Sequence, residues 1–197
     1  MYFIKKHVSL STGLTWNGRP WEIAADQLQA INPWTVMVFA PLFGLLFQKL
    51  DPNSRRLTAG NKMLAGFLLL FISCSLMSTA GFTAVGTGAK VSILWPVAAY
   101  FILTIAEILV YGTGLELAYT AAPKNLKGFV TACFLTTTAC GNLVNIWLAG
   151  FYEKGLGPGP FFGLSALLVL GAAIAFYFVS REMNRKAVLR ESFWESP

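Results

Sequence analysis

Five long apolar segments dominate the chain, and short polar stretches separate them. The hydrocarbon core of a bilayer is about 30 Å thick, and a helix of about 20 apolar residues crosses it. Backbone polar groups cannot stay unpaired in lipid, so segments of this length are predicted to be helices rather than open strands. The pattern therefore predicts an all-α membrane protein with five transmembrane helices, at about residues 24–47, 63–80, 93–121, 129–152 and 161–179.

The polar stretches divide the chain into three parts. Residues 1–22 mix charged, polar and aromatic side chains and contain no continuous apolar core, which predicts a lead-in that does not span the membrane. Residues 23–180 then form the five-helix transmembrane domain, and residues 181–197 form a polar cytoplasmic tail.

Composition supports the membrane assignment. Hydrophobic residues make up 55% of the chain and charged residues 12%, whereas an ordinary soluble domain has roughly 25% charged residues. Disordered chains combine low hydrophobicity with high charge, so disorder is excluded as well. The lipid bilayer is therefore the first expected partner.

The charge of +6 comes from 15 Lys and Arg against 9 Asp and Glu. These basic residues lie between the apolar segments, so we interpret them as topology signals and expect no nucleic-acid partner. One side of the predicted bundle receives ten of them: Lys49, Arg55, Arg56, Lys62, Lys124, Lys127, Arg181, Arg185, Lys186 and Arg190. The other side receives Lys5, Lys6, Arg19, Lys90 and Lys154. Positive charge favours the cytoplasmic side, which predicts a plasma or bacterial inner membrane protein with its amino terminus outside and its carboxyl terminus in the cytoplasm.

Enzymatic and metal-binding motifs are not found in the sequence. The cysteines Cys74, Cys133 and Cys140 lie inside apolar segments without C-x-x-C spacing, and the single histidine, His7, lies outside them. There is no H-E-x-x-H, G-x-S-x-G or P-loop pattern. We therefore expect no enzyme activity, no metal site and no cofactor.

Glu107 is the most informative residue, because it lies near the middle of the third predicted helix. An ionisable side chain at that depth is costly, and such residues usually face a cavity and mark an ion or substrate path. The alternative is a protonated carboxyl that only bonds a neighbouring helix. Residues three, four and seven positions away share its helical face, namely Tyr100, Thr104, Tyr111 and Gly114.

Three further features are weaker. Glu116 lies close to the cytoplasmic end of the same helix, which favours a gating or structural role. Asn32, before Pro33, offers its amide either to a polar ligand or as an interfacial helix cap, and local sequence favours neither. The fourth segment contains small residues around Thr136–Gly141 that would let another helix approach closely.

Several runs of residues occur in a familiar order: DQLQAINP at 26–33, AEIL at 106–109, GLELAYTAAPK at 114–124, FLTT at 134–137 and GN at 141–142. This series resembles the proton-coupled oligopeptide transporter family of the major facilitator superfamily. Members have twelve spans in two halves, and the chain is similar to helices eight to twelve, a partial carboxyl-half bundle. The resemblance implies an amino-terminal half that contributes the rest of the substrate site and lies outside this chain.

By this resemblance, Glu107 receives the amino group of the substrate and takes part in proton coupling, and Asn32 helps to hold the same group. Phe134 stands where the family usually has a tryptophan, so an aromatic wall is kept while the indole N–H is lost. Ala106 replaces a glycine before the glutamate. With Tyr111 on the face of Glu107, the predicted substrate contacts are Glu107, Asn32, Phe134 and Tyr111, and Glu107 and Glu116 are candidates for proton coupling or gating.

The sequence therefore predicts the carboxyl-terminal portion of a symporter that moves dipeptides and tripeptides with protons. Its energy source would be the proton gradient, with no bound cofactor. The alternatives are a non-transporting fragment or subunit that needs a separate amino-terminal half, and a major facilitator transporter of another small solute.

Overall fold

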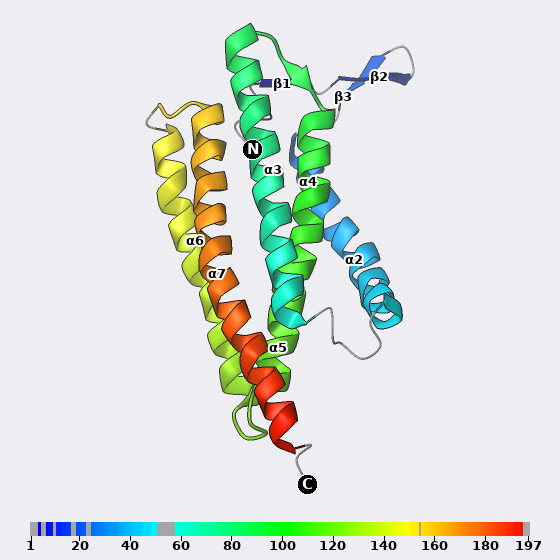
Figure 1. The fold of residues 1–197 in the computed structure, drawn as a ribbon. Helices are drawn as coiled ribbons and strands as arrows, with labels where there is room; N and C mark the ends of the chain where they lie inside the picture. The colour runs from blue at the N-terminus through cyan, green and yellow to red at the C-terminus, as the bar shows by residue number, and fades with distance from the viewer. Residues whose placement is uncertain are drawn as a thin grey trace.

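The computed structural model describes residues 4, 7–9, 11–16, 19–22, 25–50, 58–153 and 155–194. Apolar helices account for most of it (Figure 1). The helical elements are α2 (Ala25–Leu50), α3 (Ala59–Thr87), α4 (Leu94–Glu107), η1 (Ile108–Gly112), α5 (Thr113–Ala121), α6 (Lys127–Glu153) and α7 (Pro158–Trp194). The short strands are β1 (Val8–Ser9), β2 (Ser11–Trp16), β3 (Arg19–Glu22) and β4 (Val91–Ser92).

Four helical segments in the described part of the chain are long and apolar enough to cross a membrane: Ala59–Thr87, Leu94–Ala121, Lys127–Tyr152 and Pro158–Glu182. The predicted all-α membrane fold is confirmed. The first predicted span lies within α2, but its described apolar part, Asn32–Phe47, is shorter than the other four. The last helix is longer than predicted, because α7 continues to Trp194 through most of the predicted tail.

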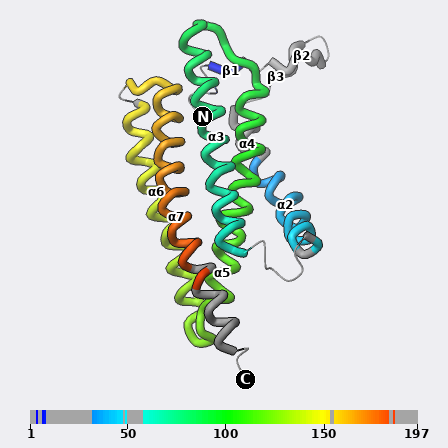
Figure 2. Tube along the Cα trace, in the orientation of Figure 1, coloured from blue at the N-terminus to red at the C-terminus, as the bar shows by residue number. Residues whose placement is uncertain are grey.

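Helix α3 lies at the centre and packs against α4 on one side and α7 on the other (Figures 1 and 2). Its buried residues are all small: Gly60, Gly66, Ser73, Ser78, Ala80, Gly81 and Ala84. Small side chains let helix backbones approach closely, which is how helices associate where lipid removes the hydrophobic driving force. The sequence analysis expected such contacts on the fourth span instead.

Two serine hydroxyls of α3 form hydrogen bonds to the neighbouring helices α4 and α7. Ser73 donates a hydrogen bond of 2.8 Å to the carbonyl oxygen of Ala99 in α4. Ser78 donates one of 2.9 Å to the carbonyl oxygen of Gly159 in α7. Both hydroxyls are buried, so each contact satisfies a polar group that lipid could not.

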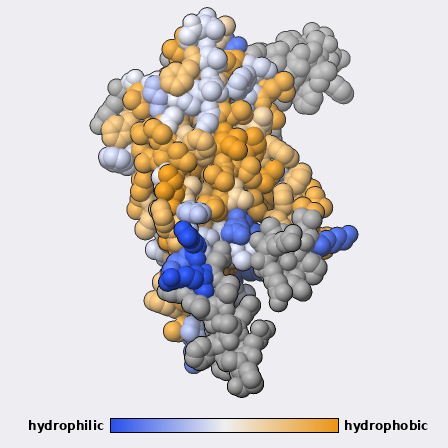
Figure 3. Space-filling view, in the orientation of Figure 1, coloured by the Kyte–Doolittle hydropathy of each residue, from blue (hydrophilic) through white to orange (hydrophobic). Residues whose placement is uncertain are grey.

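The outer surface is apolar over the middle of the molecule. Figure 3 shows a broad band of hydrophobic residues across this face, with hydrophilic residues toward its two ends. Of the four segments long enough to span, α6 is the least covered, because none of its apolar window is buried within the described structure. Gly141 lies in the stretch where another helix was expected to approach, and a Cβ atom added there would meet nothing within 4 Å.

The described part of the lead-in forms strands rather than a membrane-spanning helix. β1 pairs in parallel with β4, joining Val8 to Val91, and β2 pairs with β3 as an antiparallel hairpin. Ile4 and Val8 are buried against Ala80 and Ala84 of α3. Ile4 and β1 are therefore packed onto one end of the helix bundle.

The close approach of α3 to α7 leads to a first prediction. A Cβ atom added at Gly81 would lie 2.5 Å from the Gly159 nitrogen, so the Gly81→Ala variant has to push two backbones apart. Overpacking of this kind costs about 1–3 kcal/mol, and the thermal midpoint followed by circular dichroism in detergent should fall. Gly86→Ala is the matched control on the same helix, because a Cβ there meets nothing within 4 Å, and its midpoint should not fall. Equal midpoints for the two variants would contradict this packing.

Candidate functional site

Glu107 is the last residue of α4, halfway along the continuous helical segment Leu94–Ala121. The π-helix η1 follows it directly, before α5 restores α-helical geometry. Single π-helical turns inside α-helices are rare and often occur at functional sites. Since the Glu107 side chain is exposed in this chain, the structure leaves an acidic group open on one face in the middle of a membrane span.

The π-helical turn rests against a glycine. A Cβ at Gly66 of α3 would lie 2.6 Å from Cγ2 of Val110 and 3.1 Å from the carbonyl oxygen of Ala106, the residue before Glu107. Only a residue without a side chain leaves room for the wider turn at this point. Gly66 therefore supports the backbone that carries Glu107.

Asn32 of α2 reaches Glu107 across the helix interface. Its amide nitrogen Nδ2 donates a hydrogen bond of 3.0 Å to Oε2 of Glu107. Its Oδ1 lies 2.9 Å from the hydroxyl of Thr104, which is fully buried on α4. The structure thus brings together two residues that are 75 positions apart in the chain and that sequence reasoning had assigned to one site.

An aromatic pair lies beyond the carboxylate. The rings of Tyr111 in η1 and Phe134 in α6 have centroids 5.7 Å apart with an interplanar angle of 44°. Phe134 also covers Gly114, where an added Cβ would lie 2.7 Å from its ring. Tyr111 is 43% exposed and stands four positions after Glu107, which is also exposed, on the same helical segment.

Burial varies along the predicted polar stripe of the third span. Glu107 and Tyr111 are exposed, whereas Thr104 and Gly114 are buried, the first beside Asn32 and the second beneath Phe134. A π-helical turn holds more residues than the 3.6 of an α-turn, so residues after it are rotated relative to those before it. A uniform helical period does not predict that rotation.

Glu116 lies apart from this cluster, on α5. Its side chain is exposed and forms no ion pair with any described residue. Nearer the same end of the bundle, the Nζ atom of Lys127 lies 4.3 Å from the centre of the Tyr119 ring. The predicted gating role of Glu116 therefore stays a prediction.

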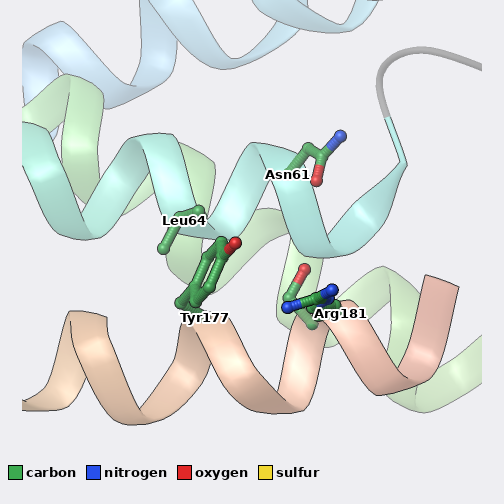
Figure 4. A pocket seen from close by; sticks show the side chains of 5 residues that line it. Asn61, Leu64, Tyr177 and Arg181 are labelled. Atoms are coloured by element: carbon green, nitrogen blue, oxygen red, sulfur yellow. The ribbon is translucent and has the colours of Figure 1, made fainter. Parts of the chain in front are cut away.

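A separate small cavity of about 160 Å³ lies between α3 and α7. In Figure 4, Tyr177 extends from α7 toward Leu64 of α3, and Arg181 follows one turn later. None of the predicted site residues lines this cavity. Within the described residues, no group of three His, Cys, Asp or Glu side chains could hold a metal ion.

The fold and the cluster together define an α-helical membrane protein with a candidate polar binding site halfway along its helices. The family model described as the POT family matches residues 12–158, and the chain belongs to that family. The family assignment made from the sequence is thereby confirmed.

Curated relatives agree with the family match. Dipeptide and tripeptide permease A of Escherichia coli (strain K12) is 30% identical over 132 residues, which cover 65% of this chain and 25% of the permease. Peptide transporter 3 of Caenorhabditis elegans is 42% identical over 84 residues, or 41% of this chain and 12% of that protein. The chain thus spans about a quarter of the length of the first relative and less of the second.

Solved structures show the same fold. A POT family transporter in complex with a thioalcohol-conjugated peptide matches with a TM-score of 0.78 at 22% identity, over 92% of this chain and 36% of that one. An auto-inhibited POT family peptide transporter matches with a TM-score of 0.66 at 28% identity, over 89% of this chain and 35% of that one. The helices of this chain therefore correspond to about a third of a whole transporter.

The bond between Asn32 and Glu107 can be tested with a double-mutant cycle. The free energy of unfolding in detergent is measured for Asn32→Leu, Glu107→Leu and the double variant. We expect a coupling of about 1 kcal/mol, the usual size of an interhelical hydrogen bond in a membrane protein. The control cycle pairs Asn32→Leu with Glu116→Leu, which should be additive. Additivity in both cycles would show that the bond contributes nothing.

Proposed function

We propose that this chain is the carboxyl-terminal portion of a proton-coupled symporter for dipeptides and tripeptides. The observation that carries the proposal is the open polar cluster halfway along the membrane span, in which Asn32 bonds the exposed Glu107. The names of the relatives support the substrate class, since they describe a dipeptide and tripeptide permease and a peptide transporter.

The cluster has the chemistry to bind the amino end of a peptide. An ionised Glu107 accepts hydrogen bonds from an ammonium group and neutralises its charge, which matters most where water is scarce. The ring of Tyr111, four positions further along the same helical segment, is 43% exposed, and an aromatic face also attracts a cation. Proton binding to Glu107 would remove its charge and weaken its hold on the ammonium group. The proton gradient would thus supply the energy, with no bound cofactor.

The remainder of the substrate site would come from an amino-terminal half. Large apolar side chains are exposed along α2 and α6, including Trp34 at 70% and Trp147 at 66%. In Figure 1 these two helices lie on opposite sides of the α3–α4 pair, where a second bundle could contact both. Major facilitator transporters bind substrate between two halves that rock against each other, so the partner would complete the site.

Charge supports the proposed orientation. The start of α3, the start of α6 and the second half of α7 lie toward one end of the bundle, and they carry Lys62, Lys127 and Arg181 (Figure 1). The lead-in strands lie at the opposite end. By the distribution of Lys and Arg, the basic end would face the cytoplasm.

The principal test is uptake of labelled dialanine by the intact transporter that includes this chain, in proteoliposomes with an inward proton gradient. Glu107→Gln keeps the size of the side chain but cannot carry a negative charge, so gradient-driven uptake should fall at least tenfold. Glu182→Gln, an exposed carboxyl in α7, is the control and should transport normally. Unchanged gradient-driven uptake in Glu107→Gln would overturn the proposal.

The aromatic wall leads to a second test of function. Phe134→Ala removes the ring that packs on Tyr111, and the KM for a dipeptide with apolar side chains should rise about tenfold, because burying an apolar substrate side chain against the ring would be worth about 1.5 kcal/mol. Phe151→Ala is the matched control, because Phe151 also lies on α6 but pairs with Trp147 instead. A similar KM in both variants would remove Phe134 from the substrate site.

The match covers only 25% of the Escherichia coli permease, which supports a second candidate function: a fragment or subunit that does not transport alone. Uptake by the purified chain and by its complex with any co-purifying membrane polypeptide distinguishes the two. Activity of the complex alone supports a split transporter, and a chain recovered without partner or uptake supports the inactive fragment. Competition with amino acids and nitrate tests for a solute other than peptides.

A further inference from the structure

Thr104 occupies a position that the proposed substrate contacts do not account for. It lies one helical turn before Glu107, and none of its surface is exposed. Its Oγ1 is 2.9 Å from Oδ1 of Asn32 and 2.9 Å from the carbonyl oxygen of Tyr100. A threonine hydroxyl carries a single proton, so it can donate fully to only one of these two acceptors at a time.

The side-chain amide of Asn32 joins this hydroxyl to the carboxyl group. One end of the amide is a donor, Nδ2, and the other is an acceptor, Oδ1. With Glu107 ionised, the carboxylate only accepts, so Nδ2 must face it and Oδ1 must face a donor. Thr104 is that donor in the structure, and the chain of bonds from Thr104 through Asn32 to Glu107 is complete.

Protonation of Glu107 changes the hydrogen-bond partner that the carboxyl needs from the Asn32 amide, from a donor to an acceptor. A protonated carboxyl has an O–H that donates, and the best acceptor within reach is Oδ1 of Asn32. If the amide turns over, Nδ2 then faces Thr104, whose hydroxyl oxygen accepts. The hydroxyl proton of Thr104 then points to the carbonyl oxygen of Tyr100, which already lies at 2.9 Å. In both arrangements a donor therefore faces an acceptor at each of the two junctions, Thr104 to Asn32 and Asn32 to Glu107.

We propose that Thr104 is a positioning residue that holds the Asn32 amide with its nitrogen toward ionised Glu107 and lets it turn over when Glu107 is protonated. The proton reaches the carboxyl from its exposed face, and only hydrogen bonds change at Asn32 and Thr104. The geometry alone carries the switch, while its effect on substrate rests on the proposed function. Only the ionised arrangement presents a negative charge to an ammonium group.

No other described charge pairs with Glu107. On the packed helices, the charged groups with described side chains lie near helix ends: Lys49 in the last turn of α2, Lys62 near the start of α3 and Lys127 at the start of α6. Lys62 and Lys127 lie over the rings of Phe47 and Tyr119. Glu116 is nine residues further along the same helical segment. The other titratable groups on these elements are Cys74, Tyr100, Tyr111, Tyr119, Cys133, Cys140 and Tyr152.

The turn of the amide can be measured directly in this 197-residue chain in lipid bilayers. The chain is labelled with ¹⁵N in asparagine side chains and ¹³C in glutamate carboxyls, and the dipolar coupling between the two is recorded by solid-state NMR. Asn32→Leu identifies the Asn32–Glu107 signal by removing it. Infrared spectra, with Glu107→Gln as reference, show at which pH Glu107 is protonated.

In the unmodified chain, the coupling should be strong while Glu107 is ionised and weak once it is protonated. Thr104→Ser keeps the hydroxyl and should preserve this change. Thr104→Val has the same shape without the hydroxyl, so Oδ1 of Asn32 loses its donor and the amide is held only at Glu107; the coupling in the ionised state should then be weaker than in the unmodified chain. A coupling that is the same in both states of the unmodified chain would overturn the switch, even if Thr104→Val fails to fold. A response of Thr104→Val like that of the unmodified chain would overturn the role of Thr104.

In the intact transporter, Thr104→Val should raise the KM for dialanine about tenfold with little change in maximal rate, and Thr104→Ser should restore it. A merely structural role would lower the amount of folded transporter and hence the maximal rate instead. If the NMR change is present but no variant affects uptake, the proposed function fails while the hydrogen-bond switch stands.

Discussion

The small residues on the buried faces of α3 determine how the other helices can be arranged. In lipid there is no hydrophobic driving force between apolar helices, so close backbone packing and a few hydrogen bonds must hold them together. Gly81 and Ser78 contact α7, whereas Ser73 and Gly66 contact the segment that carries Glu107. Because both contacts occur on one helix, α3 fixes the position of the candidate site relative to the rest of the bundle.

The site itself shows how a membrane protein can keep a carboxylate in an unfavourable place. The cost of placing Glu107 in the middle of a span is offset by the amide of Asn32, and the amide is in turn satisfied by Thr104. The helix that carries Asn32 contacts few other elements of this chain besides α4 and η1. The polar bonds therefore also contribute to the attachment of α2.

Sequence reasoning found what depends on local composition and failed where the answer depends on a neighbour. The helices follow from apolar length, and Glu107 is conspicuous because acids are rare inside membrane spans. The π-helical turn was not predictable, because it exists only where Gly66 of a different helix leaves room for it. Thr104 was placed on the correct helix, but its bond to Asn32 needs the packing of α2, which periodicity does not describe. A Cβ at Gly141 would meet nothing within 4 Å in the described structure, so the helix expected to approach this stretch stays a prediction.

The π-helical turn after Glu107 contains about one residue more than an α-helical turn would. If that turn tightened to α-helical geometry, α5 would rotate by about 100° and shift by about 1.5 Å relative to α4. Phe134, which lies on Gly114 of α5, would have to follow or lose its contact. Such a change would move the aromatic side of the site, at Phe134, while the polar side, at Asn32 and Thr104, keeps its position.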